Sequence, residues 1–209
     1  MDVLRLRQRS ASPADPWGVT GELVRRDRVV GVAATVRGVP PGLSPPVPAL
    51  IATIAAEPGA GPSALWGPEG RARLDGIVRT LCDAARAHET EVWLRPNVDS
   101  LVSDLPTILR LTRRHAEDSL RVFLEPTALL APSMGPGVGD FLQRCAEAVL
   151  PLPSIAGVLL SNAGGAPVHR GMVGRRPLAA FARAAADLGR PIALLDEEVG
   201  VQRAWLGLD

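Results

Sequence analysis

The sequence contains no lysine and no tyrosine, so its 23 lysine-or-arginine positions are all arginine. A chain without lysine cannot form the Schiff base of a lysine-dependent aldolase, anchor pyridoxal phosphate, or hold a nucleotide with a P-loop lysine. A reductase that relies on a tyrosine–lysine pair is excluded for the same reason. These absences remove several large enzyme classes before any motif is considered.

Neither a charge excess nor a long apolar run is present. The 23 basic residues are balanced by 22 acidic ones, whereas nucleic-acid-binding domains normally carry a strong basic excess. No apolar stretch approaches the roughly 18–20 residues that a membrane helix needs, and the first residues lack the apolar core of a secretion signal. We therefore expect a cytoplasmic protein with no nucleic-acid partner and no membrane partner.

Cysteine is also scarce, with only Cys82 and Cys145 in the chain. Each falls on the apolar stripe of a predicted helix, where a free cysteine acts as a small hydrophobic residue. We expect two buried thiols rather than a disulfide or a catalytic nucleophile, which fits a reducing cytoplasm.

The length of 209 residues and a hydrophobic content of 46% indicate one globular domain. Residues 1–48 are predicted to be irregular, because five prolines between Val39 and Pro48 exclude a helix there. Residues 23–36 could form a hairpin or one long strand. From residue 49 to 198, short apolar runs alternate with amphipathic segments, so we predict a single domain over 1–209 whose regular part is 49–198.

The regular part is predicted to contain buried strands separated by helices with apolar residues at i, i+3 and i+4. The strands are 49–55, 91–94, 120–124, 155–160 and 191–195, and the helices are 71–88, 103–116, 138–149 and 177–188. Ser103 is the expected N-cap of the second helix, and Gly189 ends the last one. This alternation implies a parallel sheet covered by helices, either an open doubly wound sheet or a (β/α) barrel. No G-x-G-x-x-G follows a strand, which favours the barrel.

The order and spacing of these elements resemble the C-terminal part of the xylose-isomerase-like TIM barrels, the sugar phosphate isomerase/epimerase superfamily. The matching segments are VWLRPN (92–97), SLVSDLPTILRL (100–111), RVFLEP (121–126), IAGVLLSNA (155–163), GMVGRRPLAAF (171–181) and PIALLDEE (191–198). The resemblance implies an α/β fold, a (β/α) TIM-type barrel. Such a barrel has eight strands, whereas the sequence shows six (the five above and the segment 23–36) and a candidate seventh near residue 22. We therefore expect the N-terminal part to be incomplete or irregular.

In that family, carboxylates and histidines at strand ends hold a divalent metal that polarises a hydroxy-carbonyl substrate. Here Arg95 stands at the first glutamate position, Leu159 at a histidine position and Asn162 at an aspartate position, while Asn97 matches the family's asparagine. An arginine supplies a fixed positive charge where the charge of the metal would lie. Only Glu125 and Asp196 or its neighbours remain as carboxylate candidates, so we expect a degenerate metal site and assign no metal ligand.

Polar residues at successive strand ends face the same rim of such a barrel, where ligands bind. The candidate catalytic residues are Glu125, His169 and Asp196, and the candidate ligand contacts are Arg95, Asn97, Asn162, Arg170, Arg175 and Glu197. Glycines and arginines in the loop 161–176, beside the start of a helix, favour an anionic ligand. His169 is the histidine of a rim loop and therefore the acid–base candidate.

Other noticeable side chains have structural interpretations. His88 and His115 lie at predicted helix C-termini, where a histidine complements the helix dipole. Trp93 alternates with buried neighbours on a strand and is expected in the core. Trp66, in the loop after strand 49–55, either stacks on a sugar or packs over its own loop.

Two functions remain open. In the first, which we favour, a degenerate isomerase-like barrel without a cofactor binds a small anionic polyol, a sugar phosphate or a partner protein. In the second, an active isomerase or epimerase uses Glu125 with Asp196 or Glu197 to hold a divalent metal (Mn, Mg, Co or Zn) or to move a proton beside a substrate carbonyl, with His169 assisting. Strand edges in residues 1–48 make a homodimer a candidate assembly.

Overall fold

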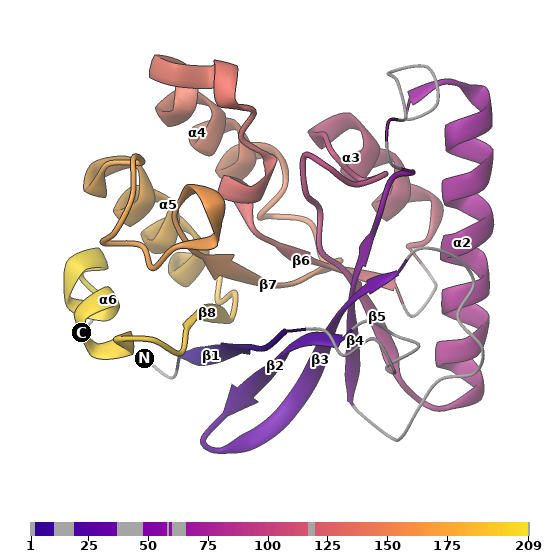
Figure 1. Cartoon of the computed structure of the whole chain (residues 1–209), viewed down its shortest axis with the longest axis horizontal. Helices are drawn as coiled ribbons and strands as arrows, with labels where there is room; N and C mark the ends of the chain where they lie inside the picture. The colour runs from indigo at the N-terminus through magenta and orange to yellow at the C-terminus, as the bar shows by residue number, and fades with distance from the viewer. Residues whose placement is uncertain are drawn as a thin grey trace.

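The computed structural model describes residues 3–10, 19–36, 48–57, 59, 66–116 and 120–208, without the side chains of residues 132, 133 and 136. Within these residues eight strands close into a barrel, in which each strand pairs with the next along the chain and the last pairs with the first (Figure 1). The strands are β1 (Leu4–Gln8), β2 (Val19–Arg25), β3 (Arg28–Val36), β4 (Ala49–Ile54), β5 (Glu91–Leu94), β6 (Leu120–Leu124), β7 (Ile155–Leu160) and β8 (Ile192–Leu195). The predicted α/β TIM-type barrel is confirmed.

The helices follow the strands of the regular part and cover the outside of the barrel (Figure 1). They are α2 (Pro68–Ala87), α3 (Leu105–Arg114), α4 (Val138–Ala148), α5 (Arg175–Asp187) and α6 (Val199–Leu206), with short 3-10 segments η1 (Pro126–Leu129), η2 (Pro132–Gly137) and η3 (Ala163–Gly165). Each of α2 to α5 buries its apolar stripe, as the periodicity predicts. The helix α6 lies in a segment for which no helix was predicted.

The start of α3 differs from the prediction. The N-cap is Asp104, whose side chain accepts a hydrogen bond from the backbone nitrogen of Thr107 at 2.6 Å. Ser103 instead accepts a hydrogen bond from Nε1 of Trp66 at 3.1 Å. The prediction of Ser103 as the cap is therefore wrong by one residue, because Asp104 has the extended backbone conformation that an N-cap requires.

The N-terminal part contains the irregularity of this barrel. Strand β2 runs antiparallel to both β1 and β3, whereas the other neighbouring strands are parallel. An antiparallel strand can be joined by a hairpin and needs no crossover helix, so three strands fit into few residues. Residues 23–36 thus take the hairpin alternative, and β1 is a strand that was not predicted. The proline-rich run up to Val47 lies outside the described residues.

The interior of the barrel is a separate apolar core. It consists of Leu4, Leu6, Leu23, Ala33, Ile51, Phe123, Leu159, Ala193 and Leu195, with Val30 and Trp93 packed against them. The rings of Trp93 and Phe123 stack with centroids 5.8 Å apart, so Trp93 belongs to the core as predicted. The barrel is therefore filled with side chains up to the level at which the strands end.

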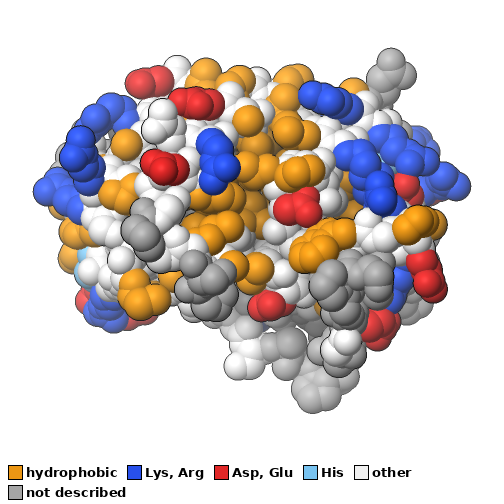
Figure 2. Space-filling view, turned by 90° about the horizontal axis from the view of Figure 1, so that it is seen from above, with side chains coloured by type: hydrophobic (Ala, Val, Ile, Leu, Met, Phe, Trp, Pro, Cys, Tyr) orange, Lys and Arg blue, Asp and Glu red, His pale blue; other side chains and the backbone are white. Residues whose placement is uncertain are grey.

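Both cysteines are free and buried, as predicted. Burial raises the pKa of the Cys145 thiol from 9.0 to about 12. No helix among the described residues is both long enough and apolar enough to span a membrane. Figure 2, which views the molecule from above, shows hydrophobic side chains gathered along the middle of this face with charged side chains around them. This face is therefore not a uniformly charged surface.

Candidate functional site

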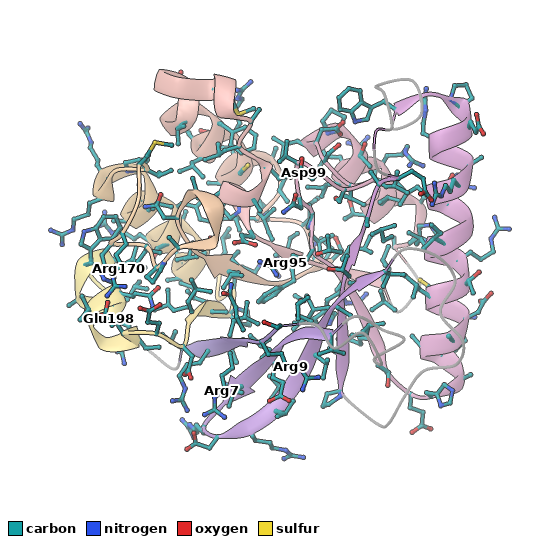
Figure 3. All side chains as sticks on the ribbon, in the orientation of Figure 1. Arg7, Arg9, Arg95, Asp99, Arg170 and Glu198 are labelled. Carbon is teal, nitrogen blue, oxygen red and sulfur yellow. The ribbon has the colours of Figure 1, made fainter. Side chains whose placement is uncertain are left out.

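The polar side chains of the site lie one layer above the barrel core, at the carboxyl ends of β5, β6 and β7. Side chains on a strand alternate between its two faces, so a residue two positions after an interior residue also points into the barrel. Arg95 follows Trp93 in this way, Glu125 follows Phe123 and Ser161 follows Leu159. Figure 3 shows Arg95 in the middle of the barrel, well separated from Arg170 and Glu198.

Arg95 and Glu125 form an ion pair inside the barrel mouth. Oε2 of Glu125 lies 2.8 Å from Nε and 2.5 Å from Nη2 of Arg95. Oε1 of Glu125 accepts a hydrogen bond from Oγ of Ser161 at 2.6 Å, and Oγ1 of Thr127 lies 3.1 Å from the same Ser161 oxygen. The Glu125 side chain is 2% exposed and the Arg95 side chain 20%, so the arginine is the member of the pair that solvent reaches.

The ion pair leaves part of the guanidinium free. A guanidinium has five N–H donors in a planar fork, and Glu125 takes one from Nε and one from Nη2. Among the described residues, no partner is seen for the other N–H groups of the Arg95 side chain. The Arg95 backbone is fixed as well, since its nitrogen donates to the Ala52 oxygen at 2.8 Å and its oxygen accepts from Oγ1 of Thr53 at 3.3 Å. The site therefore offers a rigid set of hydrogen-bond donors.

The residues at this position do not fit the divalent metal that the sequence resemblance implies. Both oxygens of Glu125 are already engaged, and a fixed guanidinium beside them repels a cation. Across the described part of the chain, no three His, Cys, Asp or Glu side chains come together in an arrangement that could hold a metal ion. The positive charge of this site is therefore that of Arg95 itself.

Asp196 does not join Glu125. The side chain of the preceding Leu195 lies in the barrel core, so Asp196 points to the outside of β8. There its carboxylate lies 3.3 Å from Nε of Arg7 and 3.6 Å from Nη1 of Arg5, two outward-facing residues of β1. The two carboxylates predicted to share one site thus lie on opposite faces of the barrel wall.

Asn162 holds the loop after β7 in place. Its side chain is buried, its Nδ2 donates to the backbone oxygens of Val168 and Val173, and its Oδ1 accepts from the backbone nitrogens of Ala163 and Val173. A Cβ atom at Gly171 would clash with this amide, so the loop passes tightly over it. These contacts use the hydrogen-bonding capacity that Asn162 was predicted to offer to a ligand.

Asn97 and Arg175 are also engaged with the backbone. Oδ1 of Asn97 accepts from the backbone nitrogen of Asp99 at 2.8 Å, which stabilises the turn between β5 and α3. Nε of Arg175 donates to the carbonyl oxygen of Trp205 at 2.6 Å and connects α5 to the end of α6. Both residues lie near strand or helix ends as predicted, and both have a structural partner.

The remaining predicted residues form a second cluster at the start of α6. Nε2 of His169 lies 2.8 Å from Glu198, and Arg170 contacts Glu197 at 2.8 Å and Glu198 at 2.6 Å. Figure 3 places Arg170 and Glu198 beside α5 and α6, away from Arg95. The structure therefore divides the predicted rim site into two, and the arginine of the second cluster is already paired with carboxylates.

The other histidines and Trp66 lie outside both clusters. His88 and His115 are the C-cap residues of α2 and α3. Trp66 is 46% exposed and is held by its hydrogen bond to Ser103. Thr127, part of the Glu125 network, was not predicted, because it lies in a 3-10 turn where no periodicity shows which way a side chain points.

No family model matches the chain, and no curated protein sequence matches it. Among solved structures, the probable 3-DHS dehydratase AsbF of Bacillus anthracis, involved in petrobactin synthesis, superposes with a TM-score of 0.55 at 13% identity, over 87% of this chain and 76% of that one. The 3-keto-D-glucoside 4-epimerase YcjR from E. coli gives a TM-score of 0.45 at 14% identity over 84% of this chain, which spans 61% of that protein. The superposition on AsbF shows that the chain shares the fold of that protein.

Proposed function

We propose that this barrel binds a small polyhydroxylated anion, such as a sugar phosphate or a sugar acid, against Arg95 and without a resident metal. The observation that carries the proposal is the buried Arg95–Glu125 pair, with the arginine partly exposed in the mouth of the barrel. In this fold class, ligands bind at the carboxyl ends of the strands, which is where Arg95 stands.

The chemistry of the guanidinium indicates the class of ligand. Its free N–H groups are donors, so they select oxygen acceptors such as carboxylate, phosphate or carbonyl groups. Because Glu125 holds the fork in one orientation, little side-chain entropy is lost when a ligand binds. The negative charge of Glu125 offsets part of the positive charge of Arg95. We therefore expect the anion to bind with moderate affinity, with a contribution from hydrogen bonds to the ligand hydroxyls.

In this proposal Glu125 positions Arg95 and does not transfer protons. A general base needs a carboxylate oxygen that can reach the substrate, and Glu125 has both oxygens engaged and is 2% exposed. Asp196 cannot assist from the outer face of the barrel. The geometry therefore favours a binding role over the alternative of an active isomerase.

Thermal unfolding with added ligands tests the proposal. The probes are glucose 6-phosphate and gluconate, with glucose as the neutral control. A ligand at 100 times its dissociation constant stabilises the folded state by about 2.7 kcal/mol, which corresponds to roughly 5–10 °C for a domain of this size. We expect one of the anions to raise the melting temperature in this way and glucose to have little effect.

The matched variants are Arg95→Met and Arg170→Met. Like Arg95, Arg170 lies beyond the carboxyl end of a strand, in the loop after β7. It belongs to the second cluster, where it pairs with Glu197. The ligand effect should disappear in Arg95→Met and persist in Arg170→Met. If Arg95→Met is too unstable to measure, Arg95→Met/Glu125→Gln removes both charges and should fold. An equal ligand effect in wild type and in either Arg95 variant would refute the proposal.

A further inference from the structure

Two threonines extend the polar lining of the barrel mouth from Arg95 onto strands β4 and β3. Strand β4 lies between β3 and β5 and runs parallel to both (Figure 1). Ala33 of β3 and Ile51 of β4 belong to the apolar interior of the barrel. Thr35 and Thr53 follow them by two positions, so both threonine side chains point inward, one layer above the core, as Arg95 does.

The pairing of the strands agrees with this placement. Thr35 is the direct partner of Thr53 in the parallel pair of β3 and β4. The Thr53 hydroxyl donates to the backbone oxygen of Arg95 on β5 at 3.3 Å. The residues that alternate with the two threonines pack instead in the core between the strands and the helices; they are Ala34, Val36, Ala52 and Ile54. Arg95, Thr53 and Thr35 therefore form an arc around the inner wall of the mouth.

The two hydroxyl groups have hydrogen-bonding capacity left for a ligand. Both threonines are half-buried and keep part of their surface exposed. The Thr53 hydroxyl uses its hydrogen in the contact with Arg95 but keeps lone pairs that can accept. For Thr35, no hydrogen-bond partner is seen among the described residues, so its hydroxyl can donate and accept. Neutral groups of this kind suit the hydroxyls of a sugar or a sugar acid.

The neighbouring strand β2 does not cover this arc at its inward position. Gly21 of β2 is the direct partner of Ala33, so it also faces the interior. A Cβ atom at Gly21 would lie 2.8 Å from the backbone oxygen of Arg7 and 3.4 Å from Cδ1 of Leu6, so only glycine fits there. The inward position of β2 beside Ala33 therefore carries no side chain that could lie over Thr35.

The direction of the Arg95 fork sets the length of a ligand that uses the whole arc. Nε of Arg95 donates to Glu125 on β6, so the guanidinium is directed away from β4. Neighbouring strands lie about 4.8 Å apart, so Thr35 is about 10 Å from Arg95 along the wall. A ligand that contacts both has to cross β5 and β4. A six-carbon sugar acid carries hydroxyls along such a span, whereas a three-carbon one held by Arg95 ends before it.

We infer that Thr53 and Thr35 bind the hydroxyl groups of the ligand, so that the mouth selects a sugar acid or sugar phosphate of about six carbons over a three-carbon one. Arg95 holds the anion, Thr53 accepts from the nearer hydroxyls, and Thr35 contacts those at the far end. The inference rests on the proposed function, because it needs an anion on Arg95. It adds the chain length and the hydroxyl contacts that decide which anion binds.

Isothermal titration calorimetry with ligands of two lengths tests the inference. Gluconate and glycerate are hydroxylated carboxylates of six and three carbons, and hexanoate is a six-carbon carboxylate without hydroxyls. Glucose 6-phosphate and glycerol 3-phosphate are the corresponding phosphates. The six-carbon hydroxylated anion should bind at least ten-fold more tightly than its three-carbon counterpart, and gluconate at least ten-fold more tightly than hexanoate.

Substitutions of the threonines locate the hydroxyl contacts. Thr35→Val keeps the shape and removes the hydroxyl, so it should weaken the six-carbon anion about three- to ten-fold and leave the three-carbon anion unchanged. Thr35→Ser keeps the hydroxyl and should bind as the wild type does. Thr53→Val should weaken both anions, because Thr53 lies beside Arg95. Thr80→Val is the matched control on the outside of α2, where the hydroxyl donates to the Gly76 oxygen at 3.1 Å, and it should change neither affinity.

Three results would overturn this inference alone: equal affinity for the two lengths, unchanged six-carbon binding in Thr35→Val, or an equal loss for both lengths in that variant. The proposed function then stands, provided that Arg95→Met abolishes binding and Arg170→Met does not. If no anion binds, or if Arg95→Met binds as tightly as the wild type, the proposed function fails and this inference fails with it.

Discussion

Replacing Arg95 with methionine removes the guanidinium that contacts Glu125 at 2.8 and 2.5 Å, and it leaves a carboxylate that is 2% exposed. Breaking a buried ion pair in this way costs about 3–5 kcal/mol, because the remaining charge has neither water nor a counterion. For a domain of this size the melting temperature falls by about 2–4 °C per kcal/mol, so we expect a decrease of roughly 6–20 °C.

The double variant Arg95→Met/Glu125→Gln measures the coupling within the pair. Glutamine keeps an acceptor for the Ser161 hydroxyl and has no charge, so the unpaired-charge penalty disappears. The double variant should therefore regain at least half of the stability lost by Arg95→Met. Arg170→Met, which breaks ion pairs that are 39–59% exposed, should lose no more than about 1 kcal/mol.

Urea titrations followed by circular dichroism provide the free energies of unfolding for the four proteins. The reasoning is refuted if Arg95→Met loses less than the Arg170 variant, or if the double variant is no more stable than the single one. Either result would mean that the pair is solvated in solution and does not act as a buried unit.

Further predictions concern the thiols and the cap of α3. Because the folded-state pKa of Cys145 is raised to about 12, the unfolded state releases its proton first as the pH rises above 9, so stability should fall between pH 9 and 12 by up to about 1.4 kcal/mol per pH unit. The chain has no lysine or tyrosine, and Cys82 is present in both proteins, so Cys145→Ala should reduce the slope of this fall in urea titrations; an unchanged slope would contradict the assignment. Cys82 and Cys145 should resist a thiol reagent in the native protein and both react in urea; rapid native labelling would show that they are accessible. Asp104→Ala should cost about 1 kcal/mol and Ser103→Ala less, and equal losses would argue against Asp104 as the cap.

The fold of residues 49–198 could be predicted because its elements repeat a strong pattern. Helix α2, for example, places Leu74, Val78 and Leu81 on one buried face. Strand β1 was missed because it has only five residues, and its signal is the alternation of inward Leu4 and Leu6 with outward arginines. An alternation this short is easily overlooked beside long periodic helices.

The site could be predicted in part. Parallel strands place their carboxyl ends at one rim, which correctly brought Arg95 and Glu125 together. Whether a residue then points into or out of the barrel depends on how many positions separate it from a core residue of the same strand. Glu125 lies two positions after the inward Phe123 and also points inward, whereas Asp196 directly follows the inward Leu195 and points outward. The second cluster around His169 could not be predicted, because it forms where a loop meets α6, a long-range contact that no local pattern encodes.

The central claim is that Arg95 supplies the positive charge of the barrel mouth and that no metal binds there. The most direct test is the metal content of protein purified without chelators, together with the melting temperature as Mn²⁺, Co²⁺, Zn²⁺ or Mg²⁺ is added. Binding to the folded state must raise the melting temperature. The account predicts no stoichiometric metal and no shift with any of the four ions. One tightly bound metal per chain with a clear stabilisation would contradict it.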